Sequence, residues 1–233
     1  MKIGLCPSGG DAHSGRELTS WTGREEVLNT EVRLKRLDQP YTYYTATDLV
    51  SPADLRRLNA DIPADELFKR EIKVGAQFPK QYNMSRFTAR EDGARTEPGR
   101  KVGPVWSELF DSIESDEFRG WLSEELAMDL DGLSLVIGVY KFGNGDYTTA
   151  DTGKAAKKVS FGLYLNEDWT AEEGGVFQVW KNKTDSAPAA EFIPLGGRGA
   201  IVCPDATSFH SIGSVHTTDD RFRLSLMIEY WQL

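Results

Sequence analysis

The pattern of apolar and polar residues changes its period near residue 133. Before this point, apolar residues recur every three or four positions in two segments, from Val105 and from about Ser115, which predicts two amphipathic helices. A third helix is predicted after Ser51, because this potential capping residue is followed by Pro52 at the first helical position. After residue 133, short apolar runs alternate with Gly, Asn, Asp and Pro, as in the strands of a β-sandwich or jelly roll.

The first half of the chain also contains strand-like segments. Residues 30–38 alternate apolar and polar positions, residues 41–50 are aromatic and β-branched, and residues 82–89 form a further candidate. Residues 90–104 are polar and rich in Gly and Pro, which predicts a flexible surface loop long enough for a lid. We expect one α+β domain: a loose arm or cap (1–30), strands and supporting helices (31–132), and a jelly-roll core (133–233) with helices packed outside it.

Composition and charge narrow the classes of partner. A hydrophobic content of 39% is sufficient for a folded core, and the net charge of −9 disfavours binding to nucleic acid or to an anionic membrane surface. The longest apolar run, residues 133–140, is too short to span a bilayer. The segment "KAAKK" (154–158) is a local basic patch, and we expect it to be a solvated turn.

Cysteine usage and the first residues predict a cytoplasmic protein. The two cysteines, Cys6 and Cys203, are far apart and form no CxxC motif, which fits a reducing compartment. The N-terminal segment lacks the apolar core and cleavage site of a secretory signal.

The candidate chemistry is limited by the small number of histidines. Only His13, His210 and His216 are present, so a zinc site of the Cys/His kind is not expected. No G-x-S-x-G elbow supports a Ser/His/Asp triad. A mononuclear site built from carboxylate and imidazole remains.

Five segments in the C-terminal half carry a specific resemblance. They are, in order, "YKFGNGDYTTADTG", "KKVSFGLYLNEDWTAEEGGVFQVW", "IPLGGRGAIVCP", "SFHSIGSV" and "RFRLSLMIEYW". Together they resemble the prolyl-4-hydroxylase-type branch of the iron(II)/2-oxoglutarate-dependent oxygenases over residues 133–231. The resemblance implies a double-stranded β-helix (jelly-roll) core, and iron(II) and 2-oxoglutarate as cofactors.

The resemblance also implies a metal site that departs from the family pattern. Iron(II) in this family takes two histidines and one carboxylate. The family's His-x-Asp falls on Asp151-Thr152-Gly153, and its distal histidine falls on His210. A second alignment puts Thr149 in the histidine position and Asp151 in the carboxylate position. In both, the first histidine is absent and Asp151 and His210 are the candidate metal ligands, with Asp146 or water as a possible compensating donor.

The other implied roles concern the cosubstrate. Arg223, thirteen residues after His210, takes the place of the arginine that binds the distal carboxylate of 2-oxoglutarate, and its planar fork suits that task. Arg221 is a near competitor for this role. Tyr164 is implied as a donor to the same carboxylate, and Tyr140 as a donor to the oxoacid.

Three functions follow from these features. The first is an oxygenase that oxidises an unactivated C–H bond, most commonly by hydroxylation, in an amino acid, a peptidyl side chain or a natural-product intermediate. The second is a catalytically degenerate family member that acts as a binding or regulatory protein. The third is a different, non-iron reaction with Asp151 as general base beside His210. We expect the N-terminal arm, the loop "REDGARTEPGRK" (90–101) and the strand "YNMSRF" (82–87) to line the substrate pocket, with Arg86 as a candidate substrate contact or surface ion pair.

Overall fold

The computed structural model of the protein describes residues 27–218 and 220–233, and strands occur along this whole range. The strands are β1 (Lys35–Leu37), β2 (Tyr43–Ala46), β3 (Lys69–Lys73), β4 (Tyr82–Glu91), β5 (Ala94–Arg95), β6 (Ser134–Phe142), β7 (Tyr147–Asp151), β8 (Lys157–Tyr164), β9 (Phe177–Val179), β10 (Ala190–Phe192), β11 (Gly199–Val202), β12 (His210–Ile212) and β13 (Arg223–Trp231). They join in one sheet of order β1-β2-β11-β8-β13-β6-β4-β7-β12-β9-β10, with β3 and β5 paired to β4.

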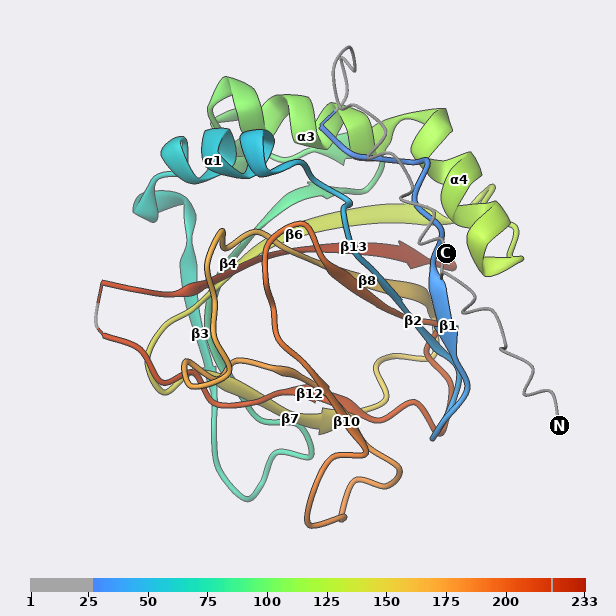
Figure 1. Ribbon diagram of the computed structural model, residues 1–233, viewed down its shortest axis with the longest axis vertical. Helices are drawn as coiled ribbons and strands as arrows, with labels where there is room; N and C mark the ends of the chain where they lie inside the picture. Colours follow the sequence, from blue (N-terminus) through green and yellow to red (C-terminus); the bar gives the residue numbers. More distant parts are fainter. Residues whose placement is uncertain (1–26, 219) are drawn as a thin grey trace, which may run out of the picture.

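The sheet curls until its two ends meet (Figure 1). Tyr43 of β2 and Phe192 of β10 belong to opposite ends of the strand order, yet their rings lie edge to face at 5.8 Å. The hydroxyl of Tyr41 donates a hydrogen bond of 2.9 Å to the backbone oxygen of Phe209, just before β12. The predicted jelly-roll core of the double-stranded β-helix type is therefore confirmed, and the N-terminal half contributes strands to it.

Helices cover the outer face of the sheet over β6, β13 and β8 (Figure 1). They are α1 (Pro52–Ala60), α2 (Glu97–Arg100), α3 (Pro104–Glu114) and α4 (Asp116–Leu126), with a 3-10 turn η1 (Asp65–Leu67). The predicted cap at Ser51 is present, because its hydroxyl accepts from the Asp54 N–H at 3.0 Å, and Ser115 caps α4 in the same way by accepting from the Phe118 N–H at 3.0 Å. None of the helices described is long and apolar enough to cross a membrane.

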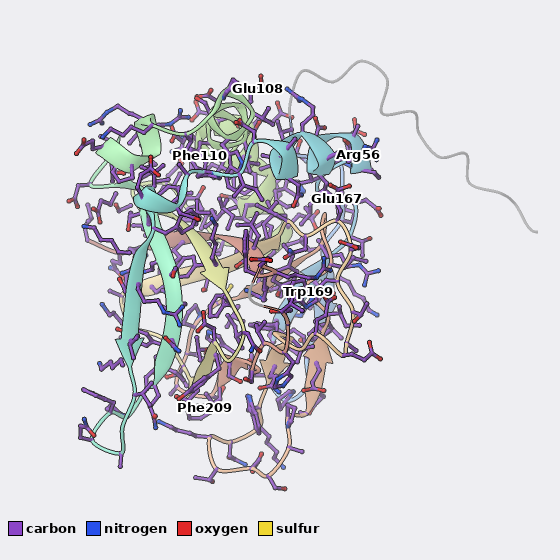
Figure 2. All side chains as sticks on the ribbon, turned by 90° about the vertical axis from the view of Figure 1, so that its left-hand side faces the viewer. Arg56, Glu108, Phe110, Glu167, Trp169 and Phe209 are labelled. Atoms are coloured by element: carbon purple, nitrogen blue, oxygen red, sulfur yellow. The ribbon has the colours of Figure 1, made fainter. Side chains whose placement is uncertain are left out.

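Side-chain alternation divides the sheet between two environments. In β13, Leu224, Leu226 and Ile228 are completely buried in the hydrophobic core that the helices share with the sheet. Phe161 of β8 belongs to the same core and stacks on Phe118 of α4 at 6.3 Å. Figure 2 shows the helical layer end-on with exposed Glu108 at its outer side, whereas buried Phe110 lies closer to the sheet. The intervening residues of β13 and β8 face the interior of the curl.

The segment over 90–104, predicted as a flexible loop or lid, is ordered by specific contacts. It contains β5 and α2, and Thr96 caps α2 by accepting from the Gly99 N–H at 3.1 Å. Gly99 packs so closely on β4 that an added Cβ would lie 2.0 Å from the Ala89 oxygen. Arg95 bonds to Glu114 of α3 at 2.9 Å. This segment was expected to line the substrate pocket, but it does not border the large cavity described below.

Strand β3 has no counterpart in the sequence prediction, and an ion pair between the half-exposed Arg70 and the buried Asp146 holds it against the barrel. Arg70 of β3 donates two hydrogen bonds to Asp146, 2.6 Å to Oδ2 and 2.5 Å to Oδ1. Asp146 is completely buried in the turn between β6 and β7, and its Oδ2 also accepts from the Gly143 N–H. The bidentate geometry fixes β3 relative to this turn.

Replacing Asp146 by Asn removes one charge-assisted bond and leaves Arg70 without its counterion. We expect Asp146→Asn to lower the free energy of unfolding by about 2 kcal/mol. Chemical denaturation monitored by tryptophan fluorescence measures this change. The exposed pair of Arg36 with Asp38 supplies the control, and Asp38→Asn should leave the denaturation midpoint unchanged. Equal midpoints for all three proteins would contradict the structural role of Asp146.

Candidate active site

A cavity of about 560 Å³ lies inside the curl of the sheet, and alternate residues of β13 form its floor. These floor residues are Arg223, Ser225, Met227, Glu229 and Trp231. Strand β13 pairs with β6 on one side and with β8 on the other, so the floor residues from Ser225 onward have fixed neighbours on both strands, whereas Arg223 pairs with Phe142 of β6 alone. The order of chemical groups along the cavity is therefore set by the register of three strands.

The middle of the floor is kept open by small residues. Met227 pairs with Gly138 of β6 and Gly162 of β8, and Ala200 of β11 pairs with Gly162. A Cβ at Gly138 would lie 2.7 Å from the ring of Tyr140. Glycine is needed here because any side chain would displace that tyrosine or fill the cavity.

Arg223 is a buried cation without an acidic partner. Arg223 is only 2% exposed, and it forms no ion pair with any of the described residues. One amino group donates to Ser225 Oγ at 2.9 Å, whereas Nε has no hydrogen-bond partner. Burial lowers the pKa of Arg223 to about 10. An unpaired guanidinium in this position creates a site for an anion, preferably a carboxylate that uses both sides of its fork.

Two tyrosines flank Ser225 beside this guanidinium. Tyr140 and Tyr164 are both strand partners of Ser225, from β6 and β8 respectively. The Tyr164 hydroxyl is buried without a hydrogen-bond partner among the described residues, and its ring centre lies 5.1 Å from Arg223 Cζ. Burial raises the pKa of each tyrosine to about 12, so both hydroxyls stay protonated and can donate to an anion.

Strand pairing brings His210 and Asp151 directly opposite each other. They are cross-strand partners of β12 and β7, and both line the cavity. His210 Nδ1 lies 2.8 Å from the Ser208 backbone oxygen, which assigns the proton to Nδ1 and the lone pair to Nε2. Burial lowers the pKa of His210 to about 4, so the imidazole is neutral at pH 7 and able to bind a metal.

Asp151 is held in its ionised form by two neighbours. Burial alone would raise its pKa, but the charge of Lys80 and the N–H of Gly153 more than offset this, and the pKa is lowered. Asp151 Oδ1 accepts from the Gly153 N–H at 2.5 Å and lies 3.4 Å from Lys80 Nζ. Lys80 follows β3 and is 71 residues away in sequence, so no local pattern indicated its presence beside the predicted ligands.

The chain provides two metal donors at this position, an imidazole lone pair and a carboxylate. This donor set suits iron(II), although it is one donor short of the family's three. No cluster of three or more His, Cys, Asp or Glu side chains that could hold a metal occurs in residues 27–218 and 220–233. A metal held by His210 and Asp151 would need its remaining ligands from outside the protein chain.

Other residues considered as third donors are occupied elsewhere. Asp146 uses both oxygens on Arg70, and Thr149 Oγ1 accepts from the Gln81 N–H at 2.9 Å. Gly153 has φ +80° and contributes its N–H to Asp151. The alignment that places Thr149 in the histidine position is the less favourable one, because Thr149 does not line the cavity.

The structure shows which of the other predicted site residues line the cavity and which do not. Arg221, the competitor of Arg223, forms ion pairs with Glu173 and Asp168 outside the cavity. Arg86 lines the cavity but pairs with Glu71 at 2.9 Å. The strand over 82–87 was expected to line the pocket, and its alternate residues from Tyr82 do so.

The other two histidines and the basic segment 154–158 differ in their positions relative to the cavity. His216 is exposed, and His13 and residues 1–26 of the predicted arm lie outside the described residues. The end of the predicted arm is not loose, because Val27 and Leu28 are buried in the hydrophobic core. The "KAAKK" segment is more than a solvated turn, because Lys154 and Lys157 both line the cavity. Lys157 starts β8 with its side chain only 15% exposed, whereas the adjacent Lys158 lies off the cavity.

Comparisons with known proteins give the family and the fold. Residues 135–229 match the family model described as the 2OG-Fe(II) oxygenase superfamily, for which iron(II) and 2-oxoglutarate are the implied cofactors. No curated protein matches the sequence. Among solved structures, a prolyl-4-hydroxylase from Pseudomonas putida is similar at 15% identity and a TM-score of 0.55, over 82% of this chain and 92% of that chain.

Two further structures are similar at lower identity. A prolyl hydroxylase from Trichoplax adhaerens, in complex with a hypoxia inducible factor peptide fragment, has 11% identity and a TM-score of 0.54, over 82% of this chain and 83% of that one. HygX from Streptomyces hygroscopicus, with nickel and 2-oxoglutarate bound, has 11% identity and a TM-score of 0.51, over 82% of both chains. At these identities the likenesses show the fold.

The position of Lys80 leads to a prediction about metal affinity. Its ammonium opposes a second cation at Asp151, so Lys80→Met should raise the affinity for Mn(II) about tenfold, or about 1.4 kcal/mol. Isothermal titration under anaerobic conditions measures this affinity. Lys73→Met removes a cavity lysine that forms no ion pair with Asp151, and should change the affinity by less than about twofold. Equal effects of the two substitutions would contradict a specific role of Lys80.

Proposed function

Residues 135–229 belong to the 2OG-Fe(II) oxygenase superfamily, and we propose that this chain is a 2-oxoglutarate-dependent oxygenase that hydroxylates an unactivated C–H bond. In the proposed reaction, the substrate C–H, O₂ and 2-oxoglutarate give the alcohol, succinate and CO₂. One oxygen atom enters the new hydroxyl and the other enters the succinate carboxylate. The substrate is a small molecule or a peptidyl side chain.

The unpaired guanidinium of Arg223 is the observation that carries this proposal. A buried cation without a counterion is costly, and a chain that bound no anion would be more stable with an apolar residue there. The distal carboxylate of 2-oxoglutarate supplies the missing charge, and the Tyr164 hydroxyl donates a further hydrogen bond to it. Both orphaned polar atoms, Arg223 Nε and Tyr164 Oη, would then have partners.

His210 and Asp151 would hold the metal. Iron(II) together with 2-oxoglutarate supplies, when bound, the activation of O₂ that oxidation of a C–H bond requires. The Ser208 carbonyl keeps the imidazole in the tautomer with a free Nε2, and the Gly153 N–H orients the carboxylate. Tyr140 lies on the opposite side of Ser225 from Tyr164 and donates to the oxoacid from there.

The alternative function, a degenerate family member that binds 2-oxoglutarate without turnover, is favoured by one observation. Lys80 already provides a positive charge at Asp151, and the position opposite His210 holds one carboxylate where the family has a second imidazole. Metal affinity and succinate release distinguish the two functions. Binding of 2-oxoglutarate without metal affinity or succinate release would establish the alternative.

Substitutions at the anion site should weaken 2-oxoglutarate binding in proportion to the bonds they remove. Tyr164→Phe deletes one hydroxyl and should weaken binding about tenfold, whereas Arg223→Met should weaken it by at least about a hundredfold. Isothermal titration with 2-oxoglutarate measures both. Arg221→Met is the matched control, because this arginine lies two residues away and outside the cavity. A loss in Arg221→Met similar to that in Arg223→Met would refute the assignment.

Metal binding should follow the ligand assignment. Asp151→Ala should lower Mn(II) affinity by at least about tenfold and abolish succinate release from 2-oxoglutarate. Asp151→His combined with Gly153→Asp restores three donors and should raise the affinity above that of the wild type. Thr149→Ala tests the other alignment and should leave the affinity unchanged. Loss of metal in Thr149→Ala but not in Asp151→Ala would overturn the assignment.

A further inference from the structure

The lining of the cavity has an excess of positive charge, although the net charge of the whole chain is −9. The described residues that line the cavity include six cationic side chains and only three anionic ones, an excess of three positive charges. The cationic ones are Lys73, Lys80, Arg86, Lys154, Lys157 and Arg223, and the anionic ones are Glu71, Asp151 and Glu229. This contrast with the rest of the molecule points to an anionic ligand.

The cofactors of the proposed function do not remove this excess. Iron(II) and the 2-oxoglutarate dianion carry opposite charges of equal size, so the loaded cavity keeps its surplus. The three acids are already used, since Lys80 pairs with Asp151, Arg86 with Glu71 and Lys157 with Glu229. Of the remaining cations, Arg223 is assigned to 2-oxoglutarate. Lys73 and Lys154 then have no acidic partner among the described residues that could compensate them.

Lys154 and Lys157 gather around one aromatic ring at the end of β13. Their ammonium nitrogens lie 5.6 Å and 4.9 Å from the ring centre of Trp231. The indole N–H donates to Glu229 Oε2 at 3.1 Å, and Lys157 bonds to the other oxygen of that carboxylate. The Glu229 carboxylate thus fixes Trp231 and Lys157 in place, and Lys154 adds a second positive charge beside them.

This cluster is remote from the cosubstrate anchor. Trp231 follows Arg223 by eight residues on the same face of β13, which corresponds to about 26 Å along an extended strand. A five-carbon dianion bound at Arg223 cannot extend over this length. The end of the cavity at Trp231 is therefore available to a second ligand while the cosubstrate is bound.

We propose that the primary substrate is a small molecule with an anionic group, a carboxylate or a phosphate, that binds Lys154 and Lys157 beside the ring of Trp231. The anion neutralises the local surplus of charge, and the indole face provides an apolar surface for the adjoining part of the substrate. The rest of the molecule then extends along the floor past Met227, where Gly138 and Gly162 leave room, toward His210 and Asp151. The assignment of this ligand as the substrate rests on the proposed function. The existence of the anion site does not depend on that function.

Binding of simple anions tests the site. Inorganic phosphate and acetate are titrated separately into protein saturated with 2-oxoglutarate, and saturable binding of at least one is expected. Lys154→Glu should weaken that binding by at least about tenfold. Lys158→Glu changes the net charge equally at a residue off the cavity, and should alter binding by less than about twofold. Equal losses in the two variants, or no saturable binding of either anion, would overturn the proposal.

A second variant separates this proposal from the proposed function. Arg223→Met should lose 2-oxoglutarate but bind phosphate or acetate as the wild type does. Anion binding that disappears with Arg223 would locate the anion at the cosubstrate anchor and overturn the site at Lys154. If the wild type binds phosphate through Lys154 but fails to bind 2-oxoglutarate, the proposed function is wrong and the anion site stands.

Turnover identifies the kind of anion. Succinate release is compared between carboxylic acids and their methyl esters, and between phosphate monoesters and the parent alcohols. Stimulation by one acidic series, lost in Lys154→Glu and kept in Lys158→Glu, supports the assignment and names the group. Equal stimulation by charged and neutral members of each pair, or stimulation by acidic peptides alone, contradicts a small anionic substrate.

Discussion

The pairing of β13 with strands on both sides is the constraint on which the rest of the structure depends. All nine of its residues pair with β6 along one edge, and Ser225–Trp231 also pair with β8 along the other, so the register of the strand is fixed on both sides. Because successive side chains point to opposite faces, one set joins the core under the helices and the other becomes the cavity floor. A shift by one residue would place Leu224 in the cavity and Arg223 in the hydrophobic core.

The same constraint arranges the chemistry of the cavity in sequence along one line. The buried guanidinium of Arg223 and the two tyrosines form an anion site at one end, and the cluster around Trp231 forms a second, more exposed one at the other. The pair of His210 and Asp151 belongs to the opposing strands β12 and β7. In the proposed reaction, a cosubstrate anchored at one end and a substrate anchored at the other would meet at this pair.

The unusual feature of this site is electrostatic as much as geometric. A family member with two histidines and a carboxylate offers a metal one negative charge and three donors. Here the carboxylate is kept, the donors fall to two, and the ammonium of Lys80 lies beside that carboxylate. In the proposed site, these differences would weaken the attraction for a divalent cation, whereas Arg223 would still anchor the oxoacid. Under this proposal, a few side chains decide between an oxygenase and a binding protein.

The sequence by itself determined the three longer helices, the cap at Ser51, the β-rich second half and the jelly-roll class, because these depend on local periodicity and on motifs of a few residues. It also singled out Asp151, His210 and Arg223 through a resemblance that extends over the motifs of a whole sheet. Only the tertiary structure decided that Lys80 faces Asp151, since these residues are 71 positions apart and no local pattern connects them. The tertiary structure also pairs Asp146 with Arg70, so this carboxylate is not available as the proposed third metal donor. It places the segment 90–104 away from the cavity, and it places Lys154 and Lys157 of the basic segment in the cavity lining. In each case a long-range contact chose among conformations that the local sequence allowed equally, and such contacts exist only once the sheet has closed.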